Sequence, residues 1–212
     1  IVRRDGAWVT IRTPLKDLSV EEIARLDVGR IDPTSRYART FAKQKAVDGT
    51  RMPLLDTLLG LPALRERPRV CLNIEVKTSP AAPRDTVSPE VLADALVARV
   101  TEKGLRKRLR VQSFDWRSLV HLRKVAPDIP LSFLTAEQSW LDNVGRKGAE
   151  PSPWLAGGDL ARHGGSLPKL VKAMGGTWWS PYHKEVDAAA IKEAHGLGLK
   201  VVVWTVNAPE DI

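Results

Sequence analysis

Strand and helix patterns alternate along this chain from residue 51 onward, and this alternation limits the possible fold more than any other feature. Short apolar and β-branched runs predict strands at about 69–76, 109–113, 129–134, 177–181 and 199–207. Helix patterns between them lie at about 89–103, 116–126, 167–174 and 188–196. Strands that alternate with helices form crossover units in a parallel sheet. The sequence therefore predicts an α/β fold.

Polar side chains gather where the predicted strands end. They are Glu75, Lys77, Gln112, Ser113, Ser180, Thr205 and Asn207. A doubly wound sheet and a (β/α)8 TIM barrel both fit the alternation, but a barrel brings all these ends into one ring, which carries the active site. No glycine-rich dinucleotide motif or Walker lysine loop points to a nucleotide site. We therefore predict a TIM barrel that is present in part, with about five of its eight βα units.

The first 50 residues differ from the rest of the chain. They are polar and turn-rich, and their one clear helix signal is a capping box from Ser19 to Glu22. We predict that residues 1–50 form a small insertion subdomain that begins upstream of residue 1, and that residues 51–212 form a partial TIM-barrel catalytic domain. The chain opens on Ile1 and stops in what reads as the start of a helix. We therefore expect a piece of a longer protein, with a natural truncated form as the alternative.

An acid and a base, Glu75 and Lys77, stand two residues apart at the end of an apolar run. Residues i and i+2 of a strand share a face, so both side chains point the same way. In a sheet that is covered on both faces, a charge needs a partner or a metal, because removing an unpaired charge from water is costly. The pair is therefore a site candidate, with a plain ion pair as the alternative.

Other residues near the strand ends also carry two interpretations. Gln112 lies at the same rim and is either a candidate substrate contact or a residue that satisfies backbone groups there. Asp115 is predicted to cap the following helix, because Asp favours that position. Trp178 and Trp179 alternate faces, so one of them belongs to the core.

The formal net charge of +8 suits an anionic partner such as nucleic acid, a membrane surface or a phosphate-bearing substrate. The densest basic stretch, residues 103–110, reads as a solvated helix end, and no zinc-finger or RNA-binding aromatic motif accompanies it. We therefore expect no nucleic-acid partner. No apolar run approaches the ~18 residues of a membrane span, so we expect a soluble protein. The single cysteine, Cys71, falls in a predicted buried strand and is expected to be an inert core thiol.

Four short motifs follow one another at plausible strand spacing. They are Asn-Ile-Glu-Val-Lys at 73–77, Gln-Ser-Phe-Asp at 112–115, Leu-Ser-Phe-Leu at 131–134 and Val-Trp-Thr-Val-Asn at 203–207. Each is weak alone, but in this order they resemble the strand motifs of the glycerophosphodiester phosphodiesterase family. Residues 15–21, 26–29 and 48–54 look like the insertion of that family and its return to the barrel. The resemblance covers nearly the whole chain.

The resemblance implies a TIM barrel that hydrolyses a small-molecule glycerophosphodiester to an alcohol and sn-glycerol 3-phosphate, in lipid and glycerol metabolism. It also implies a divalent cation, Mg²⁺ or Ca²⁺, held by carboxylates. By position, Glu75 matches a metal ligand and Lys77 matches a catalytic lysine beside the phosphate. Trp204 matches an aromatic pocket wall, and Phe133 is expected to add another. A cation and an ammonium both suit the negative charge that builds on phosphoryl oxygens, and a Glu oxygen suits Mg²⁺ or Ca²⁺.

The histidines depart from the family pattern. The acid and base histidines of the family lie in an early His-Arg-Gly motif and a later His-Asp motif, with two further carboxylate ligands between them, and this chain contains neither motif. His121 and His195 fall in predicted helices, and His163 falls in a loop. His183, near the expected mouth of the barrel, is the best remaining candidate for a substrate contact. We therefore expect that the chain by itself is inactive.

A second hypothesis is that the chain is a non-catalytic, phosphate-binding barrel remnant. The two hypotheses differ in whether the reading frame continues upstream into a His-Arg-Gly motif. The sequence leaves open the alcohol of the substrate, the choice of metal, the oligomeric state and the compartment, which is cytoplasmic, or periplasmic or secreted in a bacterium.

Overall fold

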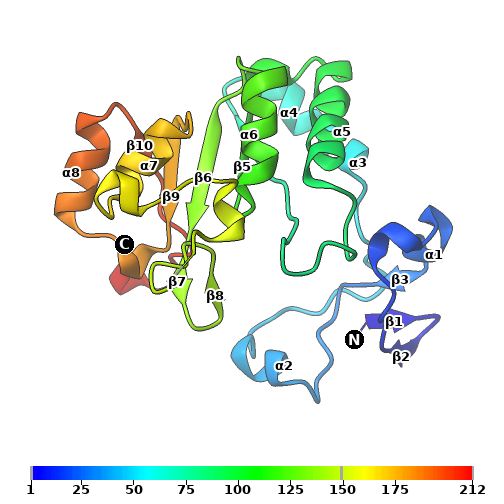
Figure 1. Ribbon diagram of the computed structural model, residues 1–212. Helices are drawn as coiled ribbons and strands as arrows, with labels where there is room; N and C mark the ends of the chain where they lie inside the picture. The colour runs from blue at the N-terminus through cyan, green and yellow to red at the C-terminus, as the bar shows by residue number, and fades with distance from the viewer. Residues whose placement is uncertain (1, 149, 212) are drawn as a thin grey trace. The chain divides into compact units, whose positions relative to one another are not determined.

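The computed structural model describes residues 2–148 and 150–211, and the chain divides into two compact units. Unit 1 spans Ile1–Pro62 and unit 2 spans Ala63–Ile212. The predicted domains, residues 1–50 and 51–212, remain predictions, because a compact unit need not coincide with an inserted subdomain. The two units are described separately below (Figure 1).

Unit 1 contains a small antiparallel sheet in the order β2-β1-β3. Its strands are β1 (Val2–Arg4), β2 (Ala7–Val9) and β3 (Leu26–Asp27). Its helices are η1 (Leu15–Asp17, a 3-10 turn), α1 (Val20–Ala24), α2 (Arg36–Thr40) and α3 (Leu55–Leu59). The predicted capping box is confirmed, since Ser19 Oγ accepts from the Glu22 N–H at 3.1 Å and Glu22 Oε2 accepts from the Ser19 N–H at 2.8 Å.

Asp27, the last residue of β3, ties two loops of unit 1 together. Its Oδ1 accepts a hydrogen bond from the Gly29 N–H at 3.0 Å, and its Oδ2 accepts one from the Gly49 N–H at 2.9 Å. These two backbone bonds, the Gly49 bond first, lower the pKa of Asp27. Gly29 must stay a glycine here, because an added Cβ would lie 1.9 Å from the carbonyl oxygen of Val47.

Unit 2 is built on a five-stranded parallel sheet in the order β10-β9-β6-β5-β4. The strands are β4 (Leu72–Glu75), β5 (Leu109–Ser113), β6 (Leu131–Thr135), β9 (Trp178–Pro181) and β10 (Lys200–Val201). All five predicted strands are therefore present, and Figure 1 shows β9, β6 and β5 side by side. The last strand is shorter than predicted. Beyond it, an isolated parallel bridge joins Tyr182 to Trp204.

The four predicted helices of the alternation are present as α5 (Pro89–Glu102), α6 (Trp116–Val125), α7 (Leu167–Ala173) and α8 (Ala188–Gly196). The sequence patterns did not indicate α4 (Pro62–Glu66), which precedes β4, or the 3-10 turns η2 (Arg106–Arg108), η3 (Pro153–Leu155), η4 (Ala161–His163) and η5 (His183–Glu185). A further 3-10 turn, η6 (Pro209–Asp211), lies where the sequence reads as the start of a helix. The predicted caps Ser88, Asp115 and Asp187 each accept a backbone N–H at the start of their helix. Among the described residues, no helix combines the length and the apolar character needed to cross a membrane.

The strand order bears on the choice between a barrel and a doubly wound sheet. The described parallel strands stand in the sheet in chain order, without the reversal that creates a switch point in a doubly wound fold. Within the described residues, β4 and β10 each pair with one parallel neighbour, so this sheet does not close. The structure thus shows an α/β fold with a parallel sheet, and the partial barrel stays a prediction.

Side chains alternate between the two faces of this sheet. On β5, Leu109, Val111 and Ser113 are at most 2% exposed, whereas the two residues between them are half-buried. Phe133 on β6 pairs with Ser113 and therefore shares the buried face, where its ring lies 4.8 Å from that of Trp116 on α6. This face is covered by helices, because α6 packs on β5 and β6. Phe133 has no exposed surface, so its predicted role as a pocket wall is corrected to a core role.

The segment after β6 contains an antiparallel hairpin that the sequence patterns do not indicate, formed by β7 (Glu137–Gln138) and β8 (Leu141–Asp142). The hairpin is anchored by the buried Asn143, whose Oδ1 accepts from the Ala136 N–H at 2.8 Å. Cys71 was expected in the core, but it precedes β4 and is exposed.

Candidate functional site

Glu75 is the last residue of β4. Its Oε1 atom is buried, and within the described part of the chain this oxygen has no hydrogen-bond partner. Burial raises the pKa of Glu75, and the nearby Lys77 ammonium lowers it by a smaller amount. An acid placed this way is available to bind a cation or a proton, because no protein group already occupies the buried oxygen.

Glu75 and Lys77 line one pocket of about 250 Å³ at the carboxyl end of β4. The other lining residues are Val76, Thr78, Ser79, Ala82, Asp85, Thr86, Phe114, Leu141 and Trp154. Lys77 is exposed, while Phe114 and Trp154 are half-buried. The structure therefore brings the two predicted site residues together at a concave surface, the usual setting for a ligand site.

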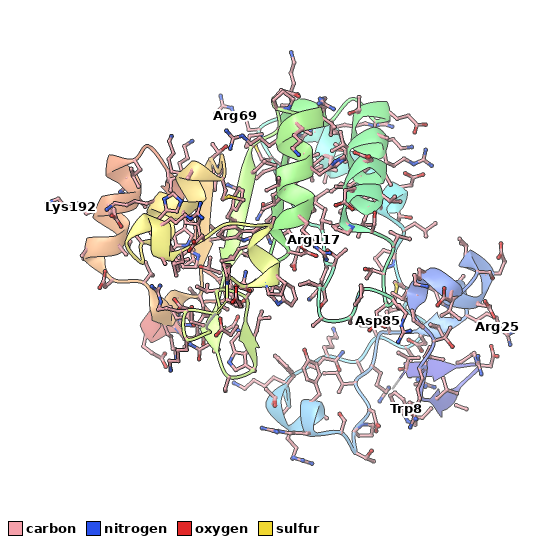
Figure 2. The ribbon with its side chains drawn as sticks, in the orientation of Figure 1. Trp8, Arg25, Arg69, Asp85, Arg117 and Lys192 are labelled. Atoms are coloured by element: carbon pink, nitrogen blue, oxygen red, sulfur yellow. The ribbon has the colours of Figure 1, made fainter. Side chains whose placement is uncertain are left out.

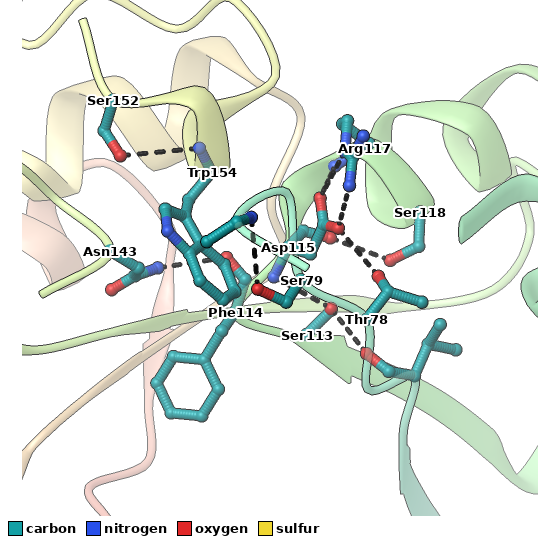
Figure 3. Close-up of polar contacts among 12 residues, drawn as sticks. Thr78, Ser79, Ser113, Phe114, Asp115, Arg117, Ser118, Asn143, Ser152 and Trp154 are labelled. Atoms are coloured by element: carbon teal, nitrogen blue, oxygen red, sulfur yellow. Dashed lines mark hydrogen bonds and ion pairs between the residues drawn. The ribbon is translucent and has the colours of Figure 1, made fainter. Parts of the chain in front are cut away.

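A hydrogen-bonded network holds the backbone on either side of Lys77 (Figure 3). On the amino side, Ser113 Oγ donates to the Val76 carbonyl at 2.6 Å. On the other side, Thr78 Oγ1 donates to Asp115 Oδ2 at 2.7 Å. The buried Asp115 is paired with Arg117, whose Nε lies 2.8 Å from Oδ1 and whose terminal nitrogen lies 2.6 Å from Oδ2. The position of Lys77 is thus set by the neighbouring strand and by the α6 cap.

Gln112 lies beside Glu75 in the sheet, since the two residues are register partners. Its Oε1 accepts a hydrogen bond from Asn73 Nδ2 at 2.6 Å, and its backbone carbonyl accepts from the Val76 N–H at 2.9 Å. Arg110 Nε donates in turn to Asn73 Oδ1 at 3.0 Å. The amide of Gln112 therefore links β4 to β5, and Gln112 does not line the pocket that holds Glu75.

Trp204 reaches the pocket through an aromatic contact. Its ring lies 5.1 Å from that of Phe114, which lines the pocket, and 5.2 Å from that of Tyr182. The indole Nε1–H donates to the Ser180 carbonyl at 3.0 Å, which orients the half-buried ring. Of the predicted tryptophan pair, Trp179 is the core residue, with 2% exposure, and Trp178 stacks under the Arg110 guanidinium at 4.0 Å.

His121 and His195 lie in helices as predicted, whereas His163 ends the 3-10 turn η4 instead of lying in a loop. His121 on α6 pairs with Asp94 at 2.7 Å, and His195 is exposed near the end of α8. The N–H of His183 donates to the Trp204 carbonyl at 2.8 Å, so this residue lies beside the aromatic group. In residues 2–148 and 150–211, no group of three or more His, Cys, Asp or Glu side chains is placed to hold a metal ion.

The family model described as glycerophosphoryl diester phosphodiesterase family matches residues 5–212. The chain belongs to this family. No curated protein sequence matches the chain significantly.

Solved structures agree with membership of the glycerophosphoryl diester phosphodiesterase family. A protein from Silicibacter pomeroyi, described as a glycerophosphoryl diester phosphodiesterase, is 33% identical with a TM-score of 0.81, and the match covers 99% of this chain and 66% of that one. The chain thus spans slightly less than two thirds of the length of this relative. A structure from Agrobacterium tumefaciens, at 18% identity and TM-score 0.57 over 99% and 73% of the chains, shares the fold. So does one from Parabacteroides distasonis, at 19% and 0.55 over 87% and 67%.

Membership of the glycerophosphoryl diester phosphodiesterase family confirms the predicted resemblance, and the roles of single residues remain predictions. Sequence reasoning missed three wall residues, Phe114, Leu141 and Trp154. Phe114 carried a usable signal, because it directly follows a predicted strand end. Leu141 and Trp154 come from the long segment between β6 and α7, where no period or motif indicated their position.

Proposed function

We propose that this chain supplies the phosphate-binding part of the active site of a glycerophosphodiester phosphodiesterase, an enzyme that hydrolyses glycerophosphodiesters to an alcohol and sn-glycerol 3-phosphate. The observation that carries this proposal is the unpartnered, buried Oε1 of Glu75 in the same pocket as Lys77. Family membership supports the reaction class. The consecutive strand order of the sheet supports a TIM barrel, of which this chain holds about five βα units.

A divalent cation, Mg²⁺ or Ca²⁺, is part of this proposal. Glu75 fits one position of such an ion, because it offers a hard oxygen atom that no protein group occupies. Mg²⁺ is commonly held by one or two carboxylates together with water and substrate phosphate oxygens, so a single described carboxylate suits part of the shell. When bound, the ion would polarise the phosphoryl group and offset its charge.

Other side chains of this chain contribute to binding the substrate. Lys77, held by the tethers on Val76 and Thr78, places an ammonium where negative charge develops on the phosphoryl oxygens. The ring of Trp204 and its neighbour Phe114 keep water from one side of the substrate, which strengthens the charge interactions. Gln112 lies outside this pocket and its amide links β4 to β5, so we propose no contact between it and the substrate.

We further propose that the chain binds substrate without turning it over. His121 and His195 lie on helices, and His121 is paired with Asp94, so neither is placed at the pocket as a general acid or base. A hydrolysis assay on the 212-residue chain is expected to release no sn-glycerol 3-phosphate. Metal-dependent release would contradict this second statement and leave the binding role of Glu75 and Lys77 intact.

Calorimetric titration with sn-glycerol 3-phosphate, with and without Mg²⁺ or Ca²⁺, tests the proposed site. Lys77→Ala should weaken binding roughly tenfold or more, because a charge-assisted contact is lost. Glu75→Gln should remove the part of the affinity that depends on the cation. The matched controls are Lys124→Ala and Glu66→Gln, which alter exposed residues of the same unit. Unchanged binding in both site variants would exclude the proposed function. Binding that needs Lys77 but ignores both metal and Glu75 would favour a phosphate-binding remnant.

A further inference from the structure

The pocket beside Lys77 is walled mainly by hydrocarbon. Its apolar lining consists of Val76, Ala82, Phe114, Leu141 and Trp154, and it encloses about 250 Å³. Exposed surface of this kind on a protein is unusual unless it binds something, since apolar groups gain by leaving water. The apolar lining is therefore a candidate binding surface of its own, beside Glu75.

Two of the three hydroxyl-bearing residues of the lining, Thr78 and Ser79, already have hydrogen-bond partners within the protein, and the third is Thr86. Thr78 Oγ1 donates to Asp115, and Ser79 Oγ accepts from the Ala81 N–H at 3.2 Å. A polyol such as glycerol needs several hydrogen bonds to replace those it makes with water, and burying its hydroxyls without them is costly. These walls therefore suit hydrocarbon better than a polyol.

The apolar wall is also held in place. Asn143 directly follows β8, which carries Leu141, and its Nδ2 donates to the Phe114 carbonyl and to the Leu134 carbonyl, both at 3.0 Å (Figure 3). The Trp154 N–H donates to Ser152 Oγ at 3.4 Å. One buried amide thus couples the hairpin to the β5–α6 turn, which gives the pocket a fixed shape before a ligand arrives.

We propose that this pocket binds a hydrocarbon group esterified to the phosphate that Lys77 contacts, so that the site favours phosphate esters of apolar alcohols. The inference rests on the proposed function, because it takes the phosphate position from Lys77. Lys77 and the apolar wall line the same pocket, so a phosphate at the ammonium places its ester substituent against Phe114, Leu141 and Trp154.

A quaternary ammonium alcohol is the main competitor, because aromatic faces attract such cations. Two carboxylates line the pocket. Glu75 is assigned to the divalent cation under the proposed function, and Asp85 is exposed on the loop between β4 and α5 (Figure 2), where water screens its charge. The aliphatic side chains of Leu141, Val76 and Ala82 offer nothing specific to a cation. The structure therefore favours hydrocarbon, and phosphocholine becomes one arm of the test.

The test compares three probes by calorimetry on the 212-residue chain: methyl phosphate, hexyl phosphate and phosphocholine. Each buried methylene improves affinity about fourfold, so hexyl phosphate should bind at least about tenfold more tightly than methyl phosphate. Trp154→Ala should reduce this ratio to below about threefold, whereas Trp154→Phe should retain most of the ratio. Lys77→Ala should weaken both phosphates by a similar factor.

Val125→Ala, which alters an exposed apolar residue on α6, is the matched control and should leave the ratio unchanged. Circular dichroism and thermal unfolding show whether each variant is folded. Equal affinity for methyl and hexyl phosphate, with binding that still depends on Lys77, would overturn the inference and leave the proposed function standing. Tighter binding of phosphocholine than of hexyl phosphate would also overturn it. If none of the probes binds, the proposed function fails and the inference fails with it.

Discussion

Two strand ends, one in each unit, carry a carboxylate in opposite surroundings. Asp27 ends β3 in unit 1 and accepts two backbone hydrogen bonds, which lower its pKa. Glu75 ends β4 in unit 2, and its buried Oε1 accepts none in the described structure, so burial raises its pKa. The first carboxylate holds its loops together as an anion. The second is destabilised as an anion by the fold around it.

Asp27 is therefore an acid that stabilises the fold, whereas Glu75 is an acid that is placed to bind a ligand. A buried polar atom without a partner costs stability, and proteins tend to keep such atoms where a ligand or a reaction needs them. Asp115 is a buried acid of unit 2 with a structural role. Arg117 and Thr78 donate hydrogen bonds to its two carboxylate oxygens (Figure 2 labels Arg117). Five predictions test this distinction.

The largest effect is expected for Asp115→Ala. Breaking a buried charge pair costs about 3–5 kcal/mol, and the lower end applies because Arg117 is partly exposed. Urea denaturation should therefore show a loss of about 3 kcal/mol in the free energy of unfolding. Asp128→Ala, which removes an exposed partner of Arg106, is the control and should change stability far less. Similar losses in the two variants would contradict the structural role of Asp115.

Asp27→Ala should loosen unit 1 at the two loops that the carboxylate joins. The N–H groups of Gly29 and Gly49 lose their acceptor, so their hydrogen exchange should accelerate roughly tenfold or more. The control in the same unit is Asp17→Ala, since the ion pair of Asp17 in the described structure is with the adjacent Lys16 at the surface. Exchange at both glycines that matches the control would show that Asp27 is dispensable for the fold.

Glu75→Gln should stabilise the fold, in contrast to the two preceding variants. The neutral amide removes a desolvated charge, so the free energy of unfolding at neutral pH should rise. The same variant should lose cation-dependent binding, which is the trade of activity for stability expected at a functional residue. A loss of stability on this substitution would place Glu75 with the structural acids.

The pH dependence of stability should separate the two acids in a further way. The raised pKa of Glu75 means that its neutral form stabilises the fold below the usual value of 4.5, and that this contribution disappears as the pH rises through the folded-state pKa. For Asp27 the lowered pKa means that the anion stabilises the fold above 3.8, and that this contribution disappears as the pH falls through the folded-state pKa. Wild type minus variant stability, measured between about pH 2 and 7, should therefore change in opposite directions for Glu75→Gln and Asp27→Asn.

The smallest effect concerns the other end of β4. Cys71 is exposed where the strand region begins, so its thiol should react with a disulfide reagent in the native state without unfolding. Cys71→Ser should change the free energy of unfolding by less than about 0.5 kcal/mol. Protection of the thiol until the protein unfolds would restore the core role that the sequence suggested.

Much of the fold could be predicted from the sequence, because its signals are local. The caps at Ser19, Ser88, Asp115 and Asp187 act within three residues, and strand runs are recognised by composition. Phe133 could not be placed this way. β6 is buried along its whole length, so no alternation marks its faces, and only the pairing of Phe133 with Ser113 assigns the ring to the helix-covered face.

Local sequence signals were enough to predict the alternation of strands and helices, the helix caps and the presence of an acid and a base at one strand end. Packing in three dimensions leaves a buried oxygen of Glu75 without a partner among the described residues, and it brings Phe114, Leu141 and Trp154 together as the wall beside it. Local propensities act between near neighbours in the chain. Whether an atom finds a partner depends on residues that packing brings from distant segments, here from the β5–α6 turn and from the loop that follows β6.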